Sequence, residues 1–391
     1  MFTKQQKKRY LAIAVALTLG GSLWGSAACT EAADAYTIDA GNPTPDAAHA
    51  VPDEGRGPGV AAGFTTSAAP LTGNTLTVDG VTHAGVAYGG YNKGSGGVTG
   101  NHLIIQNGGG ISLYGIVGGH AYGGRAGSGG DARGNTVTIN GGSAQGVYGG
   151  YAKGTGNANG NRVTLTSGTV QDGVYGGCTK GTGNANGNTV IITGGDVHAV
   201  YGGHAAGPNN NPNHESGNAD GNTVDIGAVN VDFVYGGSSQ YGTTNNNTIH
   251  LRGTRVSGDV VGGSRPNSTG NTLAIHDFGT RVGGFEYVQN LHFYLPEGTT
   301  GNSGNTMLTI NSPSGQDIRG VHIGVGVAGQ RSALQKGDVV SLMKTSRGDL
   351  TTDAVLANDV SGMQGVSLRY KFDLQKRSTD ELIATVTNVG V

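Results

Sequence analysis

The chain has 391 residues, of which 76 are Gly, nearly a fifth, whereas roughly 7% is usual. Its 24 basic and 26 acidic residues give a net charge of -2, so nucleic acid and anionic membrane surfaces are not expected partners, because both attract concentrated Lys and Arg. The Gly residues follow no three-residue collagen period and alternate with runs of Val, Ile and Thr, which predicts a repetitive all-β protein.

Residues 1–35 are predicted to be a secretory signal peptide. A basic stretch is followed by an apolar run and then by small residues. Two small-x-small patterns suit cleavage: residues 26–28, and residues 33–35, which would make Tyr36 the mature N-terminus. Lipidation of Cys29 and retention of the segment as an anchor are alternatives. The segment predicts export.

Residues 36–70 are predicted to be a linker. They are rich in Ala, Pro and Gly, and Pro residues interrupt any periodic pattern. A poorly ordered leader is the alternative for this segment.

Residues 71–312 consist of a repeat of about 26 residues. Each copy starts with Gly-Asn and a segment that alternates polar and apolar side chains, as in GNTVTI from Gly134. Each copy ends in a Val-Tyr-Gly-Gly signature, as at residues 147–150, and Ile-Val-Gly-Gly at residues 116–119 is expected to be a variant. One unit is too small to bury its own apolar side chains, so the units are expected to stack.

Stacking with one turn per repeat predicts a parallel β-helix, or β-solenoid, of about nine coils. A β-propeller is the alternative, but a four-stranded blade needs roughly 40 residues. Across residues 313–391 the repeat disappears and apparent strands follow at residues 337–342, 367–374 and 381–387. This region is predicted to be an atypical C-terminal β cap over the last coil.

Stacking aligns equivalent residues into columns. Nine Asn residues are predicted to form a structural ladder: Asn74, Asn101, Asn135, Asn161, Asn188, Asn222, Asn247, Asn271 and Asn305. Five Tyr residues are predicted to form an aromatic column, which either stabilises the sheet or contacts a ligand such as a sugar: Tyr88, Tyr148, Tyr175, Tyr201 and Tyr235.

No catalytic, cofactor-binding or metal-binding residues are predicted. Cys178 and His204 are expected on adjacent coils, but the repeats supply no third group to orient them. The repeated Asp of calcium-binding nonapeptides and the paired carboxylates of glycan-cleaving β-helices do not recur. Outside the repeats, Arg347, Gly348 and Asp349 form a polar turn that resembles the tripeptide recognised by integrin receptors.

The signal, the repeats and the C-terminal region together resemble the passenger of bacterial autotransporters. The C-terminal region contains GDVVSL from Gly337, YKFDL from Tyr370 and LIATVTN from Leu382. The resemblance implies a β-helix displayed outside the cell and followed by an outer-membrane barrel. The chain ends at Val391 without barrel strands, so the barrel is expected in cis but missing here, or in trans.

These features predict a secreted or cell-surface protein that acts as an adhesin or structural surface protein through a repetitive face. The expected ligand is a host glycan or matrix protein, with the insertion at residues 207–221 as a contact loop. The expected location is the cell surface, the outer membrane or the medium, or the periplasm if no translocator is available. Two alternatives stay open: a β-helical enzyme acting on surface glycans, and a ligand-free structural protein of the envelope.

Overall fold

The computed structural model describes residues 33–52, 58–113, 116–117, 120–208, 215–329, 333–364 and 368–390. In these ranges the chain forms strands and turns, and none of them contains a helix that could cross a bilayer. Residues 1–32 of the expected signal, including Cys29, lie outside the described residues. So do residues 209–214 of the expected contact loop.

Most strands belong to three rows, in which each strand pairs in parallel with the equivalent strand of the next repeat. The first row follows the Gly-Asn pairs and comprises β1 (Ala35–Ile38), β5 (Thr75–Asp79), β9 (His102–Gln106), the starts of β14 (Thr136–Gly154) and β16 (Arg162–Gly181), β17 (Thr189–Ile192), β19 (Thr223–Ile226), β21 (Thr248–Leu251), β24 (Thr272–Ile275), β27 (Asn290–Leu295) and β30 (His322–Val327). The second row carries the Tyr-Gly-Gly signatures and comprises β3 (Gly59–Thr65), β7 (Val86–Asn92), β12 (His120–Ala126), the ends of β14 and β16, β18 (Asp196–Ala206), β20 (Asn230–Ser239), β23 (Asp259–Val261) and β26 (Gly284–Glu286).

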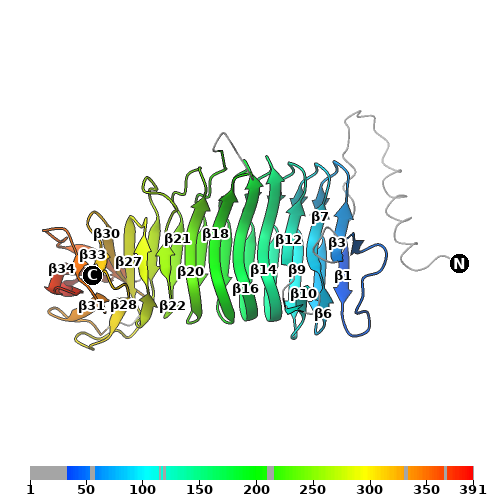
Figure 1. Ribbon diagram of the computed structural model, residues 1–391. Coiled ribbons are helices and arrows are strands. Elements are labelled where there is room, and N and C mark those ends of the chain that lie inside the picture. Colours follow the sequence, from blue (N-terminus) through cyan, green and yellow to red (C-terminus); the bar gives the residue numbers. More distant parts are fainter. Residues whose placement is uncertain are drawn as a thin grey trace, which may run out of the picture. The chain divides into compact units, whose positions relative to one another are not determined.

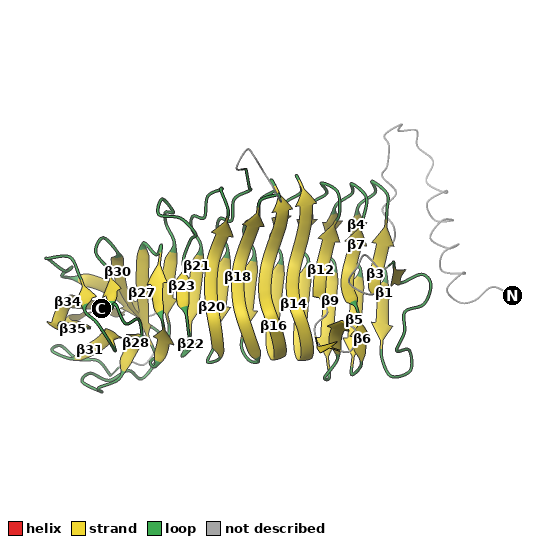
Figure 2. Cartoon of the chain, in the orientation of Figure 1, coloured by secondary structure: helices red, strands yellow, loops and turns green. Residues whose placement is uncertain are grey.

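The third row lies between the other two in the sequence of each repeat. Besides parts of β14, β16, β18 and β20, it comprises β6 (Thr82–Ala84), β10 (Gly110–Leu113), β22 (Arg255–Val256), β25 (Thr280–Val282), β28 (Thr306–Ile310) and β31 (Val339–Thr345). A separate small parallel sheet is made of β4 (Leu71–Thr72), β8 (Val98–Thr99), β13 (Ala132–Arg133) and β15 (Ala158–Asn159). The rows join in one 29-stranded sheet, and within each row the strands follow one another in chain order (Figures 1 and 2).

The alternation of side chains determines which residues fill the interior. In β9, Leu103 and Ile105 are fully buried, whereas the residues between and beside them are partly exposed. Val137 of β14 pairs with Leu103 on one side and with Val163 of β16 on the other, so apolar side chains stack on apolar side chains. The result is one apolar core that extends along the chain from Ile38 to Val386.

The N-terminal segment differs from the predicted linker at residues 36–70. β1 pairs in parallel with β5, and β3 pairs in parallel with β7, so this segment is a further repeat unit. Ile38 and Val60 are fully buried in the main core. β2 (Ala50–Val51) pairs antiparallel with β3 and covers part of its outer edge. The prediction was wrong because the Pro residues lie outside the three strands, where they do not interrupt the sheet.

The C-terminal end changes from parallel to antiparallel pairing. Parallel pairing continues beyond residue 312, because β30 and β31 follow β27 and β28. β29 (Gln316–Asp317) and β32 (Leu350–Thr351) form a small parallel pair. The last strands are antiparallel: β33 (Val360–Gln364), β34 (Leu368–Ser378) and β35 (Glu381–Gly390), of which β35 pairs with β31. Phe372 and Leu382 are fully buried and continue the core into this end.

Candidate functional site: the asparagine and tyrosine columns

Eight of the nine predicted Asn residues form a continuous buried ladder: Asn74, Asn101, Asn135, Asn161, Asn188, Asn222, Asn247 and Asn271. Each Oδ1 after the first accepts the backbone N–H of the preceding Asn. It also accepts that residue's Nδ2, as in the bonds of 2.9 and 3.1 Å from Asn161 to Asn188. The side chains are at most 3% exposed. The ladder therefore satisfies buried backbone groups at a turn of every repeat.

The second Gly of each signature packs against this ladder. A methyl group on Gly177 would overlap the side-chain amide of Asn188 and the carbonyl of Ala158. A methyl group on the preceding Gly176 would overlap the carbonyl of Gly202 on the neighbouring strand. The paired glycines and the Asn of the following unit are thus two halves of one contact, which explains why the two motifs recur together.

Both ends of the ladder differ from the prediction. Asn305 is exposed and its backbone N–H bonds to Ser303, so it does not belong to the ladder. The strand after it, β28, belongs to the third row. The ladder instead ends at Gln289, whose Oε1 accepts the N–H of Asn271 at 2.9 Å. At the other end, the N–H of Asp34 donates to Oδ1 of Asn74 at 2.9 Å.

The tyrosine column consists of six residues: Tyr88, Tyr122, Tyr148, Tyr175, Tyr201 and Tyr235. Successive rings lie 4.7–5.2 Å apart and are nearly parallel, with interplanar angles of 3–14°. Tyr122 was missed, because residues 116–119 were assigned to the signature. The register shows that Tyr122 lies between Tyr88 and Tyr148, whereas β11 (Ile116–Val117) pairs antiparallel with β10.

The stacking determines what this column presents to solvent. Between neighbouring members each ring face is covered by the next ring, so ring edges and hydroxyl groups are what the column exposes. Tyr88 and Tyr122 are buried, and the four that follow are half-buried. Burial is the main cause that raises the pKa of Tyr175, and electrostatic interactions with Tyr201, Cys178 and Asp172 raise it further. Its hydroxyl is therefore neutral at physiological pH and suited to hydrogen bonding.

A second column lies three residues further along each strand. In its first part Arg125 lies in register with Tyr91 and Tyr151. Arg125 is 8% exposed, and its guanidinium carbon lies 4.7 Å from the ring centroid of Tyr91. Its Nη1 donates to the hydroxyl of Tyr88 at 2.8 Å. A buried cation thus holds the first tyrosines together.

Cys178 and His204 are neighbours in this second column, as the sequence indicated. Burial raises the pKa of the Cys178 thiol to about 12 and lowers the pKa of His204 to about 4. Both groups are therefore neutral at physiological pH, whereas a nucleophilic cysteine needs a thiolate. Nδ1 of His204 is buried and has no hydrogen-bond partner among the described residues. The pair fills space beside the tyrosine rings.

An exposed aromatic residue lies next to the column. Phe233 is 40% exposed and stands two residues before Tyr235 on β20, so both side chains point to the same face. Beside it, Asp232 lies between His198 and Ser257, at 2.6 Å from Nδ1 of the former and 2.6 Å from Oγ of the latter. Both bonds lower the pKa of Asp232, and the bond from Ser257 has the larger effect.

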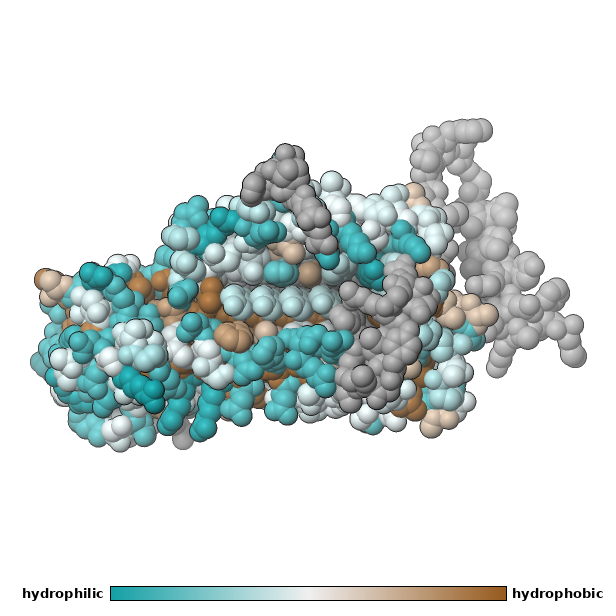
Figure 3. Space-filling view, in the orientation of Figure 1, coloured by the Kyte–Doolittle hydropathy of each residue, from teal (hydrophilic) through white to brown (hydrophobic). Residues whose placement is uncertain are grey.

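This arrangement does not activate the serine. In a hydrolase triad the imidazole lies between the serine and the carboxylate, whereas here the carboxylate of Asp232 occupies the middle. Of the three residues, His198 contacts Phe233 edge-on, with ring centroids 6.0 Å apart. Figure 3 shows a straight row of weakly polar groups across the middle of the visible face, with hydrophobic groups at its edges.

Histidines gather on the first row towards the C-terminal end. A hydrogen bond of 2.8 Å joins Nδ1 of His250 to Nε2 of His276, and the ring of His276 stacks on Tyr294 at 4.7 Å. Burial lowers the pKa of both imidazoles, that of His276 to about 4. In the described part of the chain, no group of three or more His, Cys, Asp or Glu side chains could hold a metal ion.

The tripeptide Arg347, Gly348 and Asp349 lies in an exposed turn between β31 and β32. The carbonyl of Gly348 accepts a bond of 2.8 Å from Oγ1 of Thr345, and the carbonyl of Asp349 accepts the N–H of Gln316 at 3.1 Å. The backbone is thus held against the neighbouring unit, while both charged side chains face solvent.

No protein-family model matches the chain, and no curated protein is significantly similar to it.

Proposed function

We propose that the protein is an exported parallel β-solenoid, similar to the passengers of bacterial autotransporters, that acts at the cell surface as an adhesin or structural component. Its partners would be a host glycan or matrix protein and, for translocation, an outer-membrane barrel encoded in cis or in trans. The proposal treats each repeat as one coil, with the three rows of parallel strands as its faces.

The pairing pattern supports the solenoid. Residues of one row pair with residues 27 positions further on, as Leu76 does with Leu103, and the same offset joins Val163 to Val190. The other rows also pair strands of successive repeats, with offsets that vary with the insertions, and all contribute to one core, which supports a chain that circles this core once per repeat. Such a structure grows in one dimension and presents equivalent groups at a regular spacing.

The main observation in support of the proposed surface role is the aromatic face of the second row. Four half-buried tyrosine rings are aligned at 4.7–4.8 Å, and Phe233 is exposed beside them. Aromatic and hydroxyl groups on one face suit contacts with a polysaccharide or a polar protein surface. Because the groups repeat, several weak contacts form on one ligand chain and their linkage increases avidity.

The proposal is tested by comparing the adhesion of cells that produce the protein with that of cells lacking it, on immobilised glycans and matrix proteins. The variant Phe233→Ala should reduce adhesion, and Val355→Ala should not, because Val355 is 83% exposed but lies far from the second row in sequence and outside every strand. Adhesion to a ligand that recognises the exposed tripeptide would instead be lost in the variant Asp349→Ala. Equal adhesion with and without the protein would refute the adhesin role and leave a structural one.

A further inference from the structure

We infer that the mature protein retains Asp34, so the cleavage pattern at residues 33–35 is not the processing site. The inference concerns which peptide bond is hydrolysed during export, and so rests on the proposed export. Two patterns in the sequence suit a signal peptidase, and only cleavage after Ala35 would remove Asp34 and leave an ammonium group on Tyr36.

Asp34 holds the position that an Asn occupies in every following unit up to Asn271. Its N–H donates to Oδ1 of Asn74 at 2.9 Å, and its carbonyl accepts the N–H of Thr75 at 2.7 Å. Asn74 repeats both bonds with the next unit, at 3.0 Å to Asn101 and 2.7 Å from the N–H of His102. Ala33 to Ile38 is therefore the first copy of the Gly-Asn strand, with Asp in place of Asn.

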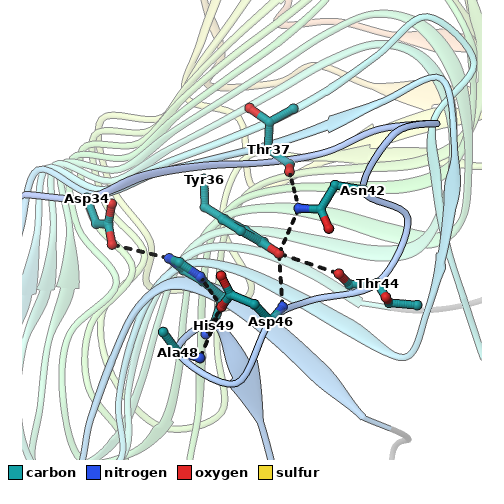
Figure 4. A network of polar contacts seen from close by, with 8 residues as sticks. All are labelled: Asp34, Tyr36, Thr37, Asn42, Thr44, Asp46, Ala48 and His49. Carbon is teal, nitrogen blue, oxygen red and sulfur yellow. Dashed lines mark hydrogen bonds and ion pairs between the residues drawn. The ribbon is translucent and has the colours of Figure 1, made fainter. Parts of the chain in front are cut away.

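The side chain of Asp34 also anchors the loop that follows β1. Its Oδ2 lies 3.2 Å from Nε2 of His49, which is only 8% exposed (Figure 4). Nδ1 of the same imidazole lies 2.6 Å from Oδ1 of Asp46. His49 is thus held between two carboxylates, that of Asp34 just before β1 and that of Asp46 within the loop.

Tyr36, on the other side of the Ala35–Tyr36 bond, contacts the same loop. Its ring stacks on the imidazole of His49 at 3.7 Å with an angle of 9°. Its hydroxyl accepts the N–H of Asp46 at 3.0 Å and Nδ2 of Asn42 at 3.1 Å (Figure 4). The carbonyl of His49 in turn accepts the N–H of Ala61 in β3. Asp34 and Tyr36, which lie on opposite sides of that bond, therefore both hold the loop over the first unit.

Cleavage after Ala35 would remove three partners at once. Oδ1 of Asn74 and Nε2 of His49 belong to buried side chains, and both would lose a polar contact. The N–H of Thr75 would lose its acceptor at the start of β5. The first strand would also begin with a charged amine on Tyr36. Unsatisfied buried polar groups are avoided in folded proteins, so a mature chain that begins at Tyr36 would have a frayed first unit.

The test is the N-terminal sequence and intact mass of the protein recovered from producing cells, together with two matched variants of the full chain. Ala35 is exposed, so Ala35→Leu should fold normally while blocking cleavage after residue 35, and Ala28→Leu blocks the upstream pattern. We expect an N-terminus before Asp34, processing unchanged in Ala35→Leu, and processing impaired in Ala28→Leu.

A mature protein that begins at Tyr36, or a failure of Ala35→Leu to be processed, would overturn the inference. Recovery of only unprocessed chain, with Met1 present and confined to the cytoplasmic fraction, would contradict the proposed export and still leave Asp34 in the folded protein. The two failures are therefore distinguishable.

Discussion

Asn188 lies in the middle of the ladder, and replacing it by Ala tests the role of the ladder directly. The substitution removes the acceptor of the Asn161 N–H, at 2.9 Å, and of the Asn161 Nδ2, at 3.1 Å. Nδ2 of Asn161 keeps a second acceptor, the carbonyl of Ala132, but the buried backbone N–H of Asn161 has no other acceptor among the described residues. The donor bond from Nδ2 of Asn188 to Asn222 is lost as well.

The magnitude follows from these losses. Leaving a buried N–H without an acceptor costs about 1–3 kcal/mol, and each lost amide hydrogen bond contributes about 1 kcal/mol. Asn188→Ala should therefore lower the free energy of unfolding by about 2–4 kcal/mol, measured by urea denaturation of the purified protein. Asn305→Ala is the matched control, because Asn305 has the same sequence context but is exposed; its effect should stay within about 0.5 kcal/mol. Equal effects of the two variants would refute the assignment of the ladder.

Three further predictions follow from the packing and the titratable groups. Gly177→Ala should lower the free energy of unfolding by about 1–3 kcal/mol because its methyl group overlaps Asn188, whereas Gly227→Ala, with its nearest atoms at 3.5 Å, should have a small effect in the same denaturation assay. Burial holds the pKa of His250, His276 and His292 below the unfolded value near 6.5, so their contribution to stability is complete above that pH and is lost as the pH falls towards the folded pKa of His276, about 4. Thermal melts between pH 7.5 and 5 should show this loss, and His276→Gln should reduce it; a melting temperature that rises on acidification would contradict the assignment. Cys178 should not react with a thiol reagent at pH 8 in the native protein and should react fully in denaturant, because it is buried with a pKa of about 12; rapid native labelling would show that the thiol is accessible.

The alternation of polar and apolar residues was enough to predict the strands of the first row and the inward direction of their side chains. Leu76 and Val78 are fully buried, as period-two alternation requires. The C-terminal strands were also predicted close to their observed positions, although parallel pairing continues past residue 312. These features depend on local sequence, so a single repeat suffices to predict them.

Positions where another residue performs the same physical role were not predictable from the motif. Asp34 uses its backbone to continue the ladder, and Gln289 uses a longer amide, so neither matches Gly-Asn. Asn305 matches the motif, but the strand that follows it pairs with a different row. The register of Tyr122 depended on an insertion that introduced a second Gly-Gly pair at residues 118–119. Only the pairing of strands between repeat units shows which residues occupy equivalent positions.

The central claim is that the repeats are displayed outside the cell. Lys180 lies in the middle of the repeats with an exposed side chain, and it is a suitable target for an amine reagent that does not cross membranes. We expect mass spectrometry to find Lys180 labelled when intact producing cells are treated. Labelling that occurs only after the envelope is permeabilised would place the repeats inside the cell and contradict the account.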